Sequence, residues 1–183
     1  MKETQRASVV LVLAESLRQQ GGWAGETHVQ KSTYFLQEFL DVPTGFAFIL
    51  YKHGPYSFDL SDTLTSMRAN GYLALEPRYP YGPSFRSGTS GKLLERLFNI
   101  SLGKYAAQIS FLGPFLAPKG VKDLERLATA LYVTKEAYRS TRERASRIHQ
   151  LKPHISTAEA VASLHELDDL RENARRAGLH TSI

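Results

Sequence analysis

The 183-residue chain contains no cysteine. Disulfide bonds, thiolate zinc sites, iron–sulfur clusters and cysteine nucleophiles are therefore excluded. The chain also lacks an apolar run of 18 or more residues, so we expect neither a membrane-spanning helix nor a membrane partner. The N-terminal segment has an amphipathic pattern with no small-residue cleavage site after it, which favours a helix over a signal peptide. These absences together predict a cytoplasmic protein.

Motifs for common enzyme chemistry are missing as well. The segment Gly88-Thr-Ser-Gly-Lys92 is similar to a phosphate loop, but Arg86 replaces the required upstream glycine and Leu93 the hydroxyl residue after the lysine. His165, Asp168 and Asp169 share a helical face, yet no second cluster completes a metal site, so a solvated helix face is the better interpretation. We predict no enzymatic activity, no metal and no cofactor.

The composition is that of an ordinary globular protein, because 42% of the residues are hydrophobic and 22% are charged. The formal net charge is +5. An excess of positive charge is compatible with binding to nucleic acid or to an acidic protein, and it does not distinguish between these two kinds of partner.

The first half of the chain has the element order of a winged-helix domain. Hydrophobic periodicity predicts two helices, a buried strand, a third helix and then a β-hairpin. We therefore expect a winged-helix-like domain over residues 1–90. The predicted helices are 4–20, 27–40 and 57–70, with Thr27 capping the second; the predicted strands are 46–51, 72–76 and 84–87.

The second half, residues 91–183, is predicted to be helical throughout. We expect a helical extension over residues 91–183 that packs on the first half, so that the whole chain is mainly α with a small β-hairpin. Ser156 or Thr157 is expected to cap the last helix, and Glu159 is placed to complete a capping box. The predicted helices are 91–98, 101–112, ending at Gly113-Pro114, 121–136 and the last helix to Gly178, with an arginine-rich segment over 137–150.

Three stretches carry a resemblance to known families: His28-Val-Gln-Lys-Ser-Thr-Tyr-Phe-Leu36, Tyr51-Lys-His-Gly-Pro-Tyr-Ser-Phe-Asp-Leu60 and Asn70-Gly-Tyr-Leu73. They resemble the second helix, the turn before the third helix and the exit into the wing of Panacea-domain and YwgA-type proteins, which are small bacterial and phage proteins. The resemblance implies a role as an antitoxin or a toxin–antitoxin adaptor, or as a regulator with a winged-helix fold.

Basic residues in and after the predicted wing favour DNA binding. Residues 78–104 contain only one acidic residue but several basic ones, among them Arg78, Arg86, Lys92 and Arg96. Three aromatic residues lie between these cations: Tyr79, Tyr81 and Phe85. Cations on a β-hairpin can contact phosphates or enter a minor groove. Lys31, at the start of the second helix, is a further candidate for phosphate contact. These residues predict a transcriptional regulator that binds duplex DNA as a homodimer.

The third helix favours a protein partner instead, because it carries Asp59 and Asp62, which phosphates repel. In this alternative, a groove beside the Lys52-His53-Gly54-Pro55 turn holds a toxin or a protease, and DNA is not bound. Tyrosine is favoured at interaction hot spots. A cationic helix face at Lys135, Arg139 and Arg142 is a further surface that an acidic partner would suit. The predicted contacts at the groove are Tyr34, Tyr51, His53 and Tyr56.

Overall fold

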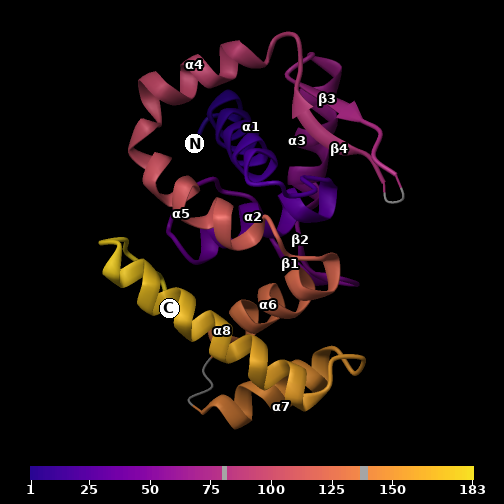
Figure 1. Cartoon of the computed structure of the whole chain (residues 1–183), viewed down its shortest axis with the longest axis vertical. Helices are drawn as coiled ribbons and strands as arrows, with labels where there is room; N and C mark the ends of the chain where they lie inside the picture. The colour runs from indigo at the N-terminus through magenta and orange to yellow at the C-terminus, as the bar shows by residue number, and fades with distance from the viewer. Residues whose placement is uncertain (80–81, 137–139) are drawn as a thin grey trace.

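The computed structural model describes residues 1–79, 82–136 and 140–183 (Figure 1). The chain is mainly helical with two small antiparallel sheets of two strands each, which confirms the predicted fold class. No helix of the described segments combines the length and the apolarity needed to cross a membrane. The helices are α1 (Glu3–Gln19), α2 (Glu26–Glu38), α3 (Phe58–Ala69), α4 (Gly91–Ser101), α5 (Ala106–Leu116), α6 (Val121–Thr134), α7 (Thr141–Leu151) and α8 (Thr157–Arg176), with a 3₁₀ turn at Gly103–Tyr105.

Helix α1 lies inside the N-terminal part of the molecule and is surrounded by other elements. It contacts α2, α3, α4, α5 and β4, and in Figure 1 α4 and α5 curve around one side of it. Val9, Val10 and Leu13 are fully buried, as the helical spacing of its apolar residues predicts. Gly113 of α5 permits a close approach here, since a Cβ atom at this position would lie 2.4 Å from Ser16 Oγ.

The predicted wing is present. Strand β3 (Leu73–Glu76) pairs with β4 (Ser84–Ser87) in antiparallel register, with Leu73 opposite Ser87. Tyr81, which was predicted to contribute to the wing, lies outside the described residues. The hairpin is held to the body by Arg18, whose guanidinium forms an ion pair with Glu76 at 2.8 Å.

A second hairpin was not predicted. The apolar run 46–51 forms a strand only over β1 (Ile49–Tyr51), which turns back to pair with β2 (Gly54–Tyr56). Gly54 makes this turn possible, because its φ of +80° is a conformation that other residues rarely adopt. Helix α3 follows directly, with the Ser57 side chain accepting a hydrogen bond from the Leu60 amide as its N-cap.

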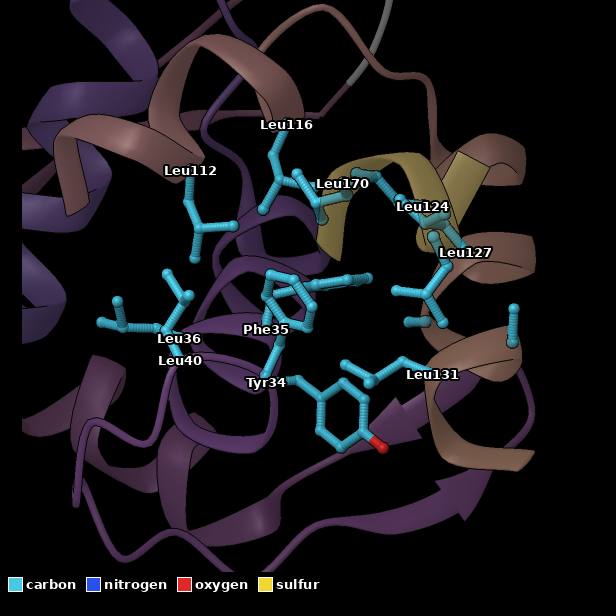
Figure 2. Close-up of a cluster of buried hydrophobic side chains, with 14 of the residues drawn as sticks. Tyr34, Phe35, Leu36, Leu40, Leu112, Leu116, Leu124, Leu127, Leu131 and Leu170 are labelled. Atoms are coloured by element: carbon cyan, nitrogen blue, oxygen red, sulfur yellow. The ribbon is translucent and has the colours of Figure 1, made fainter. Parts of the chain in front are cut away.

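One hydrophobic core contains residues from both sides of the boundary predicted at residue 90. Figure 2 shows Tyr34, Phe35 and Leu36 of α2 against leucines of α5, α6 and α8. The C-terminal helices therefore complete the core of the N-terminal half and are not an independent unit. The leucines that α5, α6 and α8 contribute, as labelled in Figure 2, are Leu112, Leu116, Leu124, Leu127, Leu131 and Leu170.

Several predicted helix ends are corrected by the structure. Helix α2 is capped by Gly25 and not by Thr27, because the helix begins at Glu26 and Thr27 already lies in its first turn. Helix α5 continues through Pro114 to Leu116, although Gly113-Pro114 was expected to end it. The capping box of α8 is confirmed: the Ser156 hydroxyl accepts from the Glu159 amide, and the Glu159 carboxylate accepts from the Ser156 amide.

Candidate functional site: the β1–β2 turn

Helix α2 fixes the β1–β2 turn through two adjacent buried side chains. The Gln30 amide nitrogen donates to Ser57 O at 2.9 Å, and its oxygen accepts from Ser57 N at 3.0 Å. The Lys31 ammonium donates to Pro55 O at 2.7 Å. Because both side chains are fully buried, these bonds hold the backbone between β2 and α3 in one position. Two of the three stretches that carry the resemblance, 28–36 and 51–60, are therefore in contact.

A second lysine holds the same turn from the other side. Lys152, which follows α7, donates from its ammonium to Tyr51 O and Lys52 O, the latter at 2.7 Å. Its nitrogen also lies 4.0 Å from a carboxylate oxygen of Glu125 on α6. Glu125, Lys31 and Lys152 are all buried, and they form a charged cluster beneath the turn.

Burial changes the acid–base properties of this cluster. It lowers the pKa of Lys31 to about 8; the Glu125 carboxylate opposes this change and the Lys152 ammonium adds to it. Burial also lowers the pKa of Lys152, again opposed by Glu125. An ammonium removed from water loses hydration that hydrogen bonds to carbonyls replace only in part. The two lysines are therefore structural cations whose protonation is coupled to the fold.

Two histidines lie at the edge of the charged cluster. His154 Nε2 is 3.1 Å from one Glu125 oxygen, and His53 Nδ1 is 3.7 Å from the other. Both imidazoles are largely exposed. Within the described residues, no set of three His, Cys, Asp or Glu side chains has the arrangement of a metal site. The two neighbouring ammoniums also disfavour a bound cation, so the cluster is best understood as the support of the turn.

The outer face of the hairpin is aromatic and exposed. The rings of Tyr51, Tyr56 and Phe58 contact one another, with centroid distances of 5.9, 5.6 and 5.2 Å. Tyr51 is 53% exposed and Phe58 54%. Ile49, opposite Tyr56 in the register, is 49% exposed and extends the same face. We call Ile49, Tyr51, Tyr56 and Phe58 the aromatic surface.

Carboxylates border the aromatic surface on the α2 and α3 side. The Tyr56 hydroxyl and the Ser61 hydroxyl both donate to Glu26 Oε1, each at 3.0 Å. Burial raises the pKa of Tyr56, and the charges of Glu26 and Asp62 raise it further. Asp62 lies one helical turn after Phe58, and Asp59 follows Phe58 directly; both are exposed. The aromatic surface is therefore negative on its α2 and α3 side, whereas the β1–β2 turn carries the exposed cation Lys52 next to Tyr51.

The predicted protein contacts separate into two groups. Tyr51, His53 and Tyr56 lie together on the β1–β2 hairpin. Tyr34 does not join them: it is only 3% exposed and packs in the core of Figure 2. The prediction that Tyr34 anchors a partner is therefore wrong, because the C-terminal helices cover the face of α2 on which it lies.

The predicted DNA contacts do not form one surface. Lys31 is a clear error, since its ammonium is buried against Pro55 O and unavailable to phosphate. Arg78 holds the wing in place: its guanidinium lies 4.7 Å from the centre of the Trp23 ring and donates to Gly22 O. Arg86 on β4, with Lys92 and Arg96 on α4, remains exposed.

The predicted cationic helix face is altered too. Lys135 forms an ion pair with Glu38 of α2, so its charge is already matched. Arg139 lies outside the described residues, and Arg142 is exposed on α7. A continuous cationic face is therefore not among the features of the described structure.

Sequence reasoning missed four residues of the site. Phe58 carried a usable signal, because it falls off the apolar stripe of α3 and so has no place in the core. Ile49 lies in the apolar run 46–51, which predicts a buried strand, so its exposure was not expected. Glu125 and Lys152 gave no signal, since only the fold brings them to the turn.

No protein-family model matches the sequence, and no curated protein matches it either. The resemblance to Panacea-domain and YwgA-type proteins therefore stays a prediction. The functional argument depends on the geometry of the site.

Proposed function

We propose that the protein is a non-enzymatic, adaptor-like or antitoxin-like regulator that binds a partner protein through the aromatic surface. The observation that supports this is the exposure of Tyr51 and Phe58, both over half exposed in a contiguous aromatic group. Contiguous apolar patches on a protein surface mark interaction sites, and tyrosine is enriched among the residues that dominate binding energy.

The buried charged cluster suits this function. Lys31 and Lys152 fix the carbonyls at both ends of the turn, so the rings above it keep their positions before a partner arrives. A preorganised surface loses little conformational entropy on binding. The burial of two ammoniums, which is costly for stability, is consistent with a requirement for a rigid turn.

Site-specific photo-crosslinking tests the proposal. A photoreactive phenylalanine analogue replaces Phe58 in one variant and Tyr79, which is 97% exposed on the wing, in the control. We expect one partner protein to be captured at position 58 and not at position 79. The purified partner should then bind the unmodified protein in calorimetry, and Phe58→Ala should weaken this binding about tenfold. Equal capture at both positions, or unchanged affinity in Phe58→Ala, would contradict the proposal.

A second candidate function is DNA binding, and the exposure of Arg86, Lys92 and Arg96 supports it. None of these cations forms an ion pair with a carboxylate within the described segments. Fluorescence anisotropy with a labelled random duplex across a salt series tests this function. If these cations meet phosphates, affinity falls steeply with salt, and replacing all three with alanine lowers both the affinity and the salt slope. No binding at low salt would eliminate general DNA binding.

A further inference from the structure

We infer that the partner segment received by the aromatic surface is cationic, with an arginine side chain lying on the exposed faces of Tyr51 and Phe58. This inference rests on the proposed function and specifies the chemistry of its partner. It follows from three features of the described structure: ring faces without a cation, carboxylates without a counter-ion, and a hollow next to them.

Elsewhere in the described chain, cations already lie over the faces of aromatic rings. The Arg6 guanidinium lies 4.4 Å from the centre of the Phe46 ring, and the Lys119 ammonium lies 4.4 Å from that of Phe115. Trp23 is covered by Arg78 in the same way. No such contact occurs at Tyr51, Tyr56 or Phe58 in the described parts of the chain. Aromatic faces attract cations, and arginine most often supplies them.

The carboxylates at the rim complete the electrostatic argument. Asp59, Asp62 and Glu26 form no ion pair with any cation of residues 1–79, 82–136 and 140–183. Three like charges near an apolar face raise the local negative potential, and a cation from outside lowers it. Phosphates and acidic peptides are repelled by the same rim, so a nucleic acid is a poor occupant of this surface.

A hollow of about 550 Å³ continues from this rim between α3 and the start of α1. Glu3, Asp59 and Asp62 line it together with Arg6, whose guanidinium is held over Phe46. The three carboxylates therefore outnumber the cations in its lining, which are Arg6 and the amino group of Met1. The hollow offers room for a second basic side chain of the same segment beside the ring-bound arginine.

The arrangement of the rings favours arginine over a quaternary ammonium. An ammonium cage needs rings that stand apart and surround the ligand, whereas Tyr51, Tyr56 and Phe58 already pack against one another. A planar guanidinium can stack on the outer ring faces and still donate to a carboxylate at the rim.

Fluorescence anisotropy with three synthetic probes tests this inference on the full chain. The first is a fluorescein-labelled peptide in which arginines alternate with glycine and serine. The second has citrulline at every arginine position, so that shape is kept and charge is lost. The third has glutamate at those positions. We expect saturable binding of the arginine peptide only, and affinity that falls as salt is added.

Two variants locate the binding. Phe58→Ala should weaken the arginine peptide about fivefold, as the loss of one cation–π contact predicts. The double variant Asp59→Asn/Asp62→Asn should weaken it and also reduce its salt dependence. Tyr79→Ala is the matched control, because it removes an exposed ring on the wing, and its affinity should be unchanged. Circular dichroism confirms that each variant is folded.

The inference is overturned if no peptide binds, if the citrulline peptide binds as well as the arginine peptide, or if both site variants keep wild-type affinity. Its failure is distinguishable from that of the proposed function. If position 58 captures a partner through an uncharged segment, the adaptor function stands and the cationic partner is wrong. If position 58 captures no partner, the function itself fails.

Discussion

The buried ammonium of Lys31 makes the stability of this protein depend on pH in the alkaline range. The pKa of Lys31 is about 8 in the folded chain, whereas the ordinary value for lysine is 10.5. Between these values the unfolded chain binds a proton that the folded chain has released. Stability rises with pH wherever the unfolded state binds more protons, so deprotonation of Lys31 stabilises the fold.

The magnitude follows from the same two values. Below about pH 8 the full cost of the buried charge is present, and it is relieved as the pH rises toward 10.5. Integrated from pH 7 to 9.5, the relief is about 2 kcal/mol. Burial lowers the pKa of Lys152 in the same sense, so it adds to the rise. Measurements stop at pH 9.5 because tyrosines begin to titrate above it.

Urea unfolding followed by circular dichroism at pH 7, 8, 9 and 9.5 measures this effect. The wild-type free energy of unfolding should rise over the series. In Lys31→Met, which keeps most of the side-chain volume, about 2 kcal/mol of that rise should be absent. Lys92→Met removes an exposed lysine of α4 and should keep the wild-type slope. A Lys31→Met slope equal to that of the wild type would refute the reasoning.

Two further predictions concern local structure. Gln30→Ala leaves the buried amide of Ser57 without a partner and removes one of the two hydrogen bonds that its carbonyl accepts, the other coming from the Ser61 amide. The free energy of unfolding should therefore fall by about 1–3 kcal/mol in urea titrations. A loss below about 0.5 kcal/mol would show that water replaces both bonds. Ser156→Ala removes the N-cap of α8 and should cost about 1 kcal/mol, whereas Ser156→Asp should restore most of it, as differential scanning calorimetry would measure. Equal melting temperatures for all three proteins would contradict this.

The parts of the fold that sequence predicted well are those decided by neighbouring residues. Helix α1 follows from its apolar spacing, and the start of α8 from the Ser156–Glu159 capping box. The β1–β2 hairpin was missed because its strands have three residues each, too few to show alternation. Its pairing depends on support from α2 and α6, which periodicity within 46–56 does not contain.

The site shows the same division between local and distant information. Lys31 was expected on the surface because a lysine in a polar run at the start of a helix is usually solvated. It is buried because its partner carbonyl, Pro55 O, arrives from the next hairpin. Exposure was misjudged in the opposite direction for Ile49, which an apolar run suggested would be buried. Both errors have one cause, namely the packing of the hairpin against α2 and α6.

The family-like residues at the turn are best explained by this backbone geometry. Gly54 supplies a positive φ, and a Cβ there would lie 3.2 Å from Thr129 Oγ1, so both conformation and space favour glycine. Gln30 and Lys31 bind the backbone that follows it. These residues would be needed in any protein that builds the same turn, whatever it binds. The exposed Tyr51 and Phe58 make no comparable contribution to the core, and partner choice is therefore expected to depend on them and on the carboxylates beside them.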